Sequence, residues 1–305
     1  MCNRLIKLAF MSILITVIFA LNSLCDVSKE DLIVPEPDKT QILTLKDGSK
    51  LVGRIIDVIH NEVRFQSDLG ITSIVISKIA NIKEVDEESF RDGKYWFPNP
   101  NQTRLYFAGT GRMLKAGDGY ISDVYIFFPG FAFGLTDNIT IGGGMSIFPG
   151  LSLNEQLYYF TPKVGLNTNS NFELAVSGLI LRIPNYVKDL GFSEAEDDSY
   201  IVGLINIIGT IGSADKSLTA GLGYGFADGE LADKPAIIIG GEYRFARRLS
   251  FVSENWILPG VDVPMVSYGI RFFGESLTTD LAFVNILDDD AIFPGVPYLD
   301  FVWNF

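Results

Sequence analysis

The sequence predicts an all-β protein, and three observations lead to that prediction. The 305 residues include 30 glycines and 35 phenylalanines and tyrosines (23 + 12), which suits many strands better than packed helices. No second long apolar run follows the one near the amino terminus. Short runs in which apolar and polar residues alternate recur along the chain, as expected of strands with two different faces.

The amino terminus has the build of a secretory signal peptide. Arg4 and Lys7 precede the apolar run Leu8–Leu21, which small and polar residues follow. A transmembrane anchor is the alternative, but the run is shorter than the roughly 20 apolar residues that a span needs. We therefore expect a signal peptide at 1–25, with lipidation of Cys25 disfavoured, and an extended linker at 26–39.

Charge and residue usage narrow the function classes. A net charge of -13 disfavours a nucleic-acid partner held by phosphate contacts. His60, within residues 40–85, is the only histidine, so Ser–His catalysis is excluded from residues 86–305. No cysteine pair is available for a zinc site. These counts predict no enzyme and no cofactor. The acidic runs Glu194–Asp198 and Asp288–Asp290 are interpreted as solvated loop charge, with calcium binding as the alternative.

The sequence pattern at residues 40–85 predicts a separate small β domain. About five short strands fall in 45 residues, and Asp47-Gly48 between two of them is a strong hairpin signal. The segment Leu45–Ile55 resembles the first motif of Sm-like and SH3-like small barrels. RNA binding is not carried over, because the pocket residues of the Sm family do not recur at matching spacing. The domain is interpreted as a periplasmic adaptor or plug-like unit, with structural decoration as the alternative.

Residues 86–102 form a charged connector that runs into the aromatic cluster Tyr95–Phe97. Trp and Tyr favour the membrane interface, so this position is consistent with a chain approaching a membrane. A loop packed on the small domain is the alternative.

Residues 103–305 predict twelve strands joined by alternately short and long connections. Such alternation is typical of outer-membrane barrels, and an even count places both ends of the barrel on the periplasmic side. The expected strands are 103–111, 119–135, 139–148, 156–167, 172–184, 199–212, 218–227, 235–246, 249–258, 265–274, 277–286 and 297–305.

One face of these strands is apolar and largely aromatic, and the other carries the charged residues. In Pro235–Ala246, Tyr243 and Phe245 share one face while Glu242 and Arg244 share the other. Aromatic residues also recur near strand ends, as interface girdles would, including Tyr106, Trp256 and Tyr298. A soluble β-sandwich would show the same alternation, so the aromatic character of the apolar face and the signal peptide favour the membrane barrel.

Eight charged residues are expected to point into the barrel. Three cations and five anions at such positions predict either a closed ion-pair network or the lining of a wet passage, because a buried charge needs a partner. They are Lys163, Glu173, Glu242, Arg244, Glu254, Arg271, Asp280 and Asp300.

The last strand, Pro297–Phe305, resembles the closing strand of bacterial outer-membrane barrels, where it serves as the assembly signal. Its candidate signal residues are Tyr298, Phe301, Trp303 and Phe305. We expect this strand to pair with Thr103–Gly111, which removes the open edges of the barrel.

The barrel region is similar to uncharacterised outer-membrane barrels of the Bacteroidetes type. The resemblance is carried by Pro98–Arg104, Gly134–Asn138, Gly142–Gly144, Ser253–Trp256 and Asp280–Phe283. It implies a Gram-negative outer membrane, with outer-membrane lipid and the barrel-assembly machinery as partners, and it supplies no activity. The resulting hypotheses are a non-enzymatic narrow channel or small-solute binding barrel, and a structural adaptor whose periplasmic domain, within 26–102, binds a protein partner.

Overall fold

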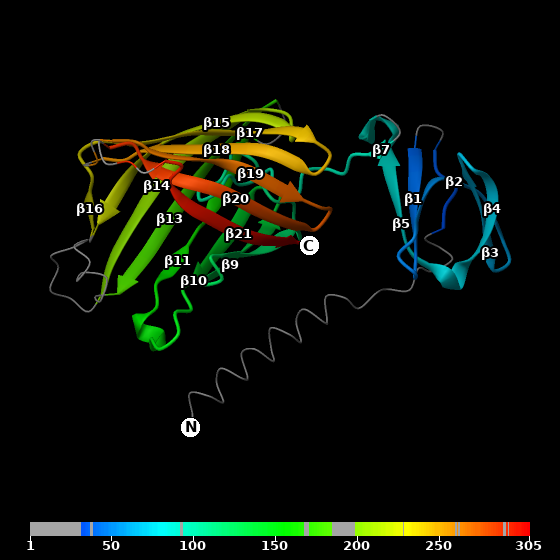
Figure 1. Ribbon diagram of the computed structural model, residues 1–305, viewed down its shortest axis with the longest axis horizontal. Coiled ribbons are helices and arrows are strands. Elements are labelled where there is room, and N and C mark those ends of the chain that lie inside the picture. Colours follow the sequence, from blue (N-terminus) through cyan, green and yellow to red (C-terminus); the bar gives the residue numbers. More distant parts are fainter. Residues whose placement is uncertain are drawn as a thin grey trace, which may run out of the picture. The chain divides into compact units, whose positions relative to one another are not determined.

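The computed structural model describes residues 32–36, 39–91, 94–167, 171–184, 199–227, 229–259, 261, 263–288, 291 and 293–305. The predicted signal peptide, most of the linker and the acidic run Glu194–Asp198 lie outside these ranges. The chain divides into two compact units, Met1–Trp96 and Phe97–Phe305, joined at the boundary between Trp96 and Phe97 (Figure 1). No helix among the described residues is long and apolar enough to cross a membrane.

The first unit contains a five-stranded antiparallel sheet in the order β4-β3-β2-β1-β5. Its strands are β1 (Lys39–Leu45), β2 (Lys50–Ile59), β3 (Glu62–Ser67), β4 (Gly70–Val75) and β5 (Ile79–Asp86), followed by a small hairpin of β6 (Phe90–Arg91) and β7 (Lys94–Tyr95). Its core is apolar and consists of Leu32, Leu43, Ile55, Val63, Phe65, Ile74 and Ile79.

Local chemistry explains the hairpins of this unit. Gly48 has a φ of 86°, and the amide of Ser49 donates to Asp47 Oδ1 at 2.9 Å, which closes the predicted Asp-Gly turn. The same hydrogen bond lowers the pKa of Asp47 below its ordinary value. Gly53 is required for close strand approach, because a Cβ there would lie 1.9 Å from the carbonyl oxygen of Gln66. His60 occupies the β2–β3 turn with a φ of 52°, as a turn residue would.

The second unit is a closed antiparallel barrel, as the sequence predicted (Figure 1). Within the described residues the wall has twelve strands, since β11 and β12 are two parts of one strand and β16 is a short addition to β15. The segments are β8 (Gly119–Val124), β9 (Phe128–Thr136), β10 (Ile139–Met145), β11 (Tyr158–Phe160), β12 (Lys163–Asn167), β13 (Phe172–Pro184), β14 (Ser199–Gly212), β15 (Lys216–Ala227), β16 (Glu230–Leu231), β17 (Ala236–Ala246), β18 (Leu249–Ile257), β19 (Met265–Phe273), β20 (Leu277–Ile286) and β21 (Val296–Asn304).

The closing pair differs from the predicted one. β21 pairs with β8, with Val302 opposite Ser122, so the prediction that the last strand pairs with Thr103–Gly111 is wrong. Gly119 and Phe305 exchange both backbone hydrogen bonds at 2.9 Å, which brings the two ends of the barrel together. The residues from Thr103 to Gly111 form only an isolated bridge, between Arg104 and Gly109.

The predicted strand 119–135 is divided into the two strands β8 and β9. The wall therefore still has twelve strands, although the one predicted at 103–111 is not part of it. Tyr125 and Ile126 both have a positive φ, 54° and 67°, and turn the chain between β8 and β9. This conformation is unusual for a β-branched residue, which is why the sequence offered no turn signal. The predicted strand 156–167 is interrupted between β11 and β12 at Thr161 and Pro162.

Candidate functional site

The lumen of the barrel holds residues 97–114, which we call the inner segment, and the exposed residues 115–118 lead from it to β8. It is not a wall strand, although the sequence predicted one at 103–111 and an outer loop at 112–118. Phe97, Leu105 and Tyr106 are buried, and the segment contacts inward side chains from strands on all sides of the wall. Its backbone is hydrogen-bonded both to side chains of the barrel and within the segment, as between the N–H of Leu105 and the carbonyl of Ala108.

Glu254 on β18 holds the tip of the inner segment. Its carboxylate accepts the backbone N–H groups of Tyr106, Phe107 and Ala108 at 2.8, 3.0 and 3.1 Å. The indole Nε1 of Trp256 donates to the same carboxylate at 2.6 Å. Four donors therefore replace the water that a buried carboxylate has lost.

Arg271 on β19 joins the inner segment to the neighbouring strand β20 and, on its other side, to β17, one strand beyond β18 in the sheet. Its side chain is 0% exposed, and it donates to Asp280 at 2.7 and 3.0 Å and to Glu242 at 3.0 Å. It also donates to the carbonyl of Leu105 at 2.7 Å. Arg104, from the inner segment itself, bonds both Asp280, at 3.0 Å, and Asp300. Two arginines and three carboxylates thus form one buried network.

A second set of contacts lies toward the end of the barrel with the short turns. Arg244 donates to the carbonyl of Phe97 and to Asp215, both at 2.9 Å. Glu242 accepts from Asn99 Nδ2 at 2.8 Å. These contacts fix the point where the inner segment begins.

The start of β13 is joined to the inner segment by Arg112. It pairs with Glu173 at 2.5 Å and donates to the carbonyls of Gly212 and Ser213 at 2.8 and 3.0 Å. Lys163 differs from these charged groups, because its Nζ donates to the carbonyls of Thr103 and Arg112. No ion pair of Lys163 occurs among the described residues.

All eight charged residues that the sequence placed in the lumen contact the inner segment or an arginine from it. The sequence reasoning missed the partners Arg104 and Arg112, which it placed in a strand and a loop. One signal was present: Leu105, Tyr106, Phe107 and Ala108 are four apolar residues in succession and do not alternate.

The four candidate assembly residues occupy different faces of β21. Phe301 is exposed on the outer face, and Phe305 is exposed at the chain end. Tyr298 instead points inward, is 1% exposed, and stacks on Tyr106 with ring centroids 5.2 Å apart. The girdle interpretation of Tyr106, Trp256 and Tyr298 is therefore wrong, since all three are buried on the lumen side.

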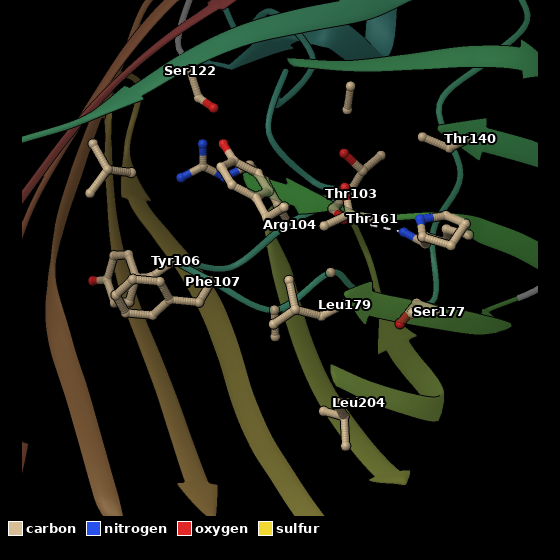
Figure 2. A pocket seen from close by; sticks show the side chains of 18 of the residues that line it. Thr103, Arg104, Tyr106, Phe107, Ser122, Thr140, Thr161, Ser177, Leu179 and Leu204 are labelled. Carbon is tan, nitrogen blue, oxygen red and sulfur yellow. Dashed lines mark hydrogen bonds between the residues drawn. The ribbon is translucent and has the colours of Figure 1, made fainter. Parts of the chain in front are cut away.

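A cavity of about 450 Å³ lies between the inner segment and the part of the wall formed by β8 to β14 (Figure 2). Phe107, Leu179 and Leu204 supply apolar lining, whereas Thr140 and Lys163 supply polar groups. Among the described residues no group of three or more His, Cys, Asp or Glu side chains is arranged to hold a metal ion.

The outer face of the barrel is apolar along nearly every strand. The exposed side chains include Phe131, Leu135, Phe160, Val164, Ile201, Ile205, Ile211, Leu218, Leu222, Ile239, Tyr243, Phe245, Phe251, Phe272, Leu281 and Phe301. A closed barrel that is apolar outside and charged inside inverts the arrangement of a water-soluble protein. This is the construction of an outer-membrane β-barrel.

Comparison with solved structures finds outer-membrane proteins at low similarity. The chain is similar to a loop-deletion mutant of OmpT, an outer membrane protein of Vibrio cholerae (12% identity, 88% of this chain and 96% of that chain covered, TM-score 0.34). It is also similar to Omp33 of Acinetobacter baumannii (8% identity, 62% and 95% covered, TM-score 0.34) and to Salmonella typhi OmpF in complex with daunomycin (9% identity, 88% and 95% covered, TM-score 0.32). At these identities the likeness concerns the fold alone. No protein-family model and no curated protein matches the chain.

The prediction that the chain is not an enzyme is wrong as a general exclusion. The class of outer-membrane barrels does not by itself exclude catalysis, and OmpT of Vibrio cholerae is among the similar structures. The histidine argument removes only reactions that need a histidine in the barrel, because His60 lies in the first unit. The buried carboxylates Asp280 and Asp300 show that acidic groups are present in the lumen.

Proposed function

We propose that this outer-membrane barrel binds a small solute in its lumen cavity, and that the inner segment keeps the lumen closed to free diffusion. The observation that supports the proposal most directly is the cavity of about 450 Å³ beside the inner segment. Sites for small molecules usually have volumes of about 300–1,000 Å³ and mostly apolar walls with a few placed polar groups. The lining described above has that composition.

A permanently open channel fits the geometry less well. The inner segment crosses the lumen and is held by Arg104, Arg271 and Glu254, all of which are buried. Separating one buried charge from its partner costs about 3–5 kcal/mol, so spontaneous withdrawal of the segment is rare. Planar-bilayer recordings are expected to show no steady conductance, and a large constant conductance would contradict the closed lumen.

Binding is tested by filling the cavity. Leu179 lines the cavity, while its neighbour Ile180 lies on the opposite face of β13. In lipid nanodiscs, calorimetric titration with decanol and decanoate should give saturable binding that Leu179→Trp abolishes and Ile180→Trp leaves intact. Empty nanodiscs correct for partition into lipid. The proposal fails if the wild-type protein shows no saturable binding, or if Leu179→Trp binds as the wild type does.

A second function, that of an envelope adaptor, is favoured by the separate core of the first unit. The position of β1 between β2 and β5 is compatible with the SH3-like or Sm-like barrel that Leu45–Ile55 resembles. In this proposal residues 40–85 bind a periplasmic protein while the barrel serves as the anchor. Deletion of 40–85 should remove a specific co-purifying protein, and an unchanged set of co-purifying proteins would contradict the adaptor role.

The adaptor proposal also requires residues 26–102 to lie in the periplasm. The exchange of hydrogen bonds between Gly119 and Phe305 places both ends of the wall on the side of the short turns, which supports that orientation. Protease added to intact cells should leave the first unit uncut, and permeabilised cells should lose it. Cleavage of the first unit in intact cells would contradict a periplasmic location of residues 26–102. Two further points stay predictions. One is recognition of Tyr298, Phe301, Trp303 and Phe305 by the assembly machinery, and the other is a Bacteroidetes origin.

A further inference from the structure

A row of polar side chains crosses the wall of the cavity. In the strand register Thr140 on β10 is opposite Lys163 on β12, Lys163 is opposite Ser177 on β13, and Ser177 is opposite Asn206 on β14. All four line the cavity, and Ser177 Oγ donates to Asn206 Oδ1 at 2.8 Å. Four adjacent strands therefore present one continuous polar row to the lumen.

The next two rows, toward the end with the longer connections, are mostly apolar. Leu179 is opposite Leu204, and Leu181 is opposite Tyr159, and all of these line the cavity. In Figure 2 Thr140 lies well apart from Leu204, at the other end of the lining. The cavity thus has a polar end and an apolar body.

Two groups in the polar row lack the partner that their burial calls for. Lys163 is 8% exposed, and its two hydrogen bonds, to the carbonyls of Thr103 and Arg112, leave one of its three ammonium donors unused. Thr140 is 7% exposed, and its Oγ1 is buried without a hydrogen-bond partner. Since buried polar atoms are normally paired, both groups point to a ligand with acceptor oxygens.

The other charges that line the cavity are compensated. Arg104 carries Asp280 and Asp300, and Asp300 is separated from Lys163 by the strands β8, β9 and β10. Within the described part of the lining, Lys163 is therefore the cation that makes no ion pair, since the nearby Glu173 is paired with Arg112. The polar end of the cavity favours an anion.

We propose that the cavity binds a small amphipathic carboxylate. Its carboxylate accepts from Lys163 Nζ and Thr140 Oγ1, and its apolar chain lies along Leu179, Leu181 and Leu204. This inference rests on the proposed binding function and specifies the class of ligand.

The experiment compares decanoate with decanol, which share an apolar chain and differ in charge, in the nanodisc titration described above. Wild-type protein should bind decanoate about tenfold more tightly than decanol, because hydrogen bonds to a charged group are the stronger ones. Lys163→Met should lower decanoate affinity about tenfold and leave decanol affinity unchanged, whereas Lys163→Arg should retain the preference.

Thr140→Val tests the same site independently, in case the Lys163→Met variant does not fold. The hydroxyl of Thr140 has no partner in the protein, so its removal should leave the barrel intact while decanoate affinity falls about fivefold. Equal binding of decanol and decanoate, unaffected by Lys163→Met and Thr140→Val, overturns the carboxylate inference but not the binding function. Absence of saturable binding by either compound overturns both.

Discussion

The two halves of the lumen wall differ in how their polar groups are partnered. On β17 to β21, which we call the paired half, Arg244 and Arg271 each contact at least one carboxylate, and Glu254 accepts four donors. On β10 to β14, the cavity half, Lys163 donates only to carbonyl oxygens and Thr140 Oγ1 has no hydrogen-bond partner. Buried hydroxyls without a partner also occur in the paired half, at Ser250 and Ser267. The difference between the halves is that each arginine of the paired half has a carboxylate, whereas the cavity half presents to the cavity a cation that makes no ion pair.

This difference suggests that the paired half holds the inner segment in place and that the cavity half binds a solute. Charges that are matched within the chain hold the inner segment, and they have little left to offer a solute. Groups that lack an internal partner raise the free energy of the empty barrel and are stabilised when a ligand supplies the missing oxygen atoms. The comparison predicts that substitutions in the two halves change stability in opposite ways.

The largest effect is expected from Arg271→Met in the paired half. Removing this cation leaves Glu242 buried without an ion pair and leaves Arg104 as the single cation for Asp280 and Asp300, which should lower the free energy of unfolding by about 3–5 kcal/mol. Urea unfolding in lipid vesicles, followed by tryptophan fluorescence, measures the change. Arg248→Met, an exposed turn position, is the control and should change stability by less than about 0.5 kcal/mol. Equal effects of the two variants would contradict the role of the paired half in holding the inner segment.

A smaller effect is expected from Glu254→Gln. The substitution removes the charge that receives the N–H groups of Tyr106, Phe107 and Ala108, at a cost of about 1.5–3 kcal/mol. Hydrogen–deuterium exchange of these three amides should accelerate about tenfold or more, since about 1.4 kcal/mol corresponds to a factor of ten. The exposed Glu230→Gln should leave their exchange unchanged. Unaltered exchange in Glu254→Gln would show that the tip is held by other contacts.

The sequence predicted the wall well because a strand that separates lipid from lumen must alternate. The predicted strand 235–246 corresponds to β17, Ala236–Ala246, with Tyr243 and Phe245 exposed and Glu242 and Arg244 buried. Each residue reports its own environment through its polarity, so neither partner nor register is needed to assign a face. This is why most wall strands and the antiparallel barrel could be predicted. The count of twelve agrees because the false strand at 103–111 offsets the division of 119–135 into β8 and β9.

The interior could not be predicted in the same way, because its contacts join distant parts of the chain. Arg104 meets Asp300, 196 positions away, and no local pattern encodes that pairing. An apolar stretch enclosed by a barrel also looks like a strand, which explains the error at Thr103–Gly111. The polar row of Thr140, Lys163, Ser177 and Asn206 appears only when the register of four strands is known.

The smallest expected effect distinguishes two buried threonines of the cavity half, one whose hydroxyl has hydrogen-bond partners and one whose hydroxyl has none. Thr210 Oγ1 accepts the N–H of Gly111 at 2.8 Å and bonds Thr219 Oγ1 at 2.8 Å, whereas Thr140 Oγ1 has no partner. In the same urea unfolding, Thr210→Val should lower the free energy of unfolding by about 1 kcal/mol, because it leaves a buried N–H unpaired. Thr140→Val should leave it unchanged or raise it by up to about 1 kcal/mol, since an unpaired buried hydroxyl is removed. Equal destabilisation by both variants would mean that the Thr140 hydroxyl is already satisfied in the empty barrel, and the cavity half would then have lost one of its two free groups.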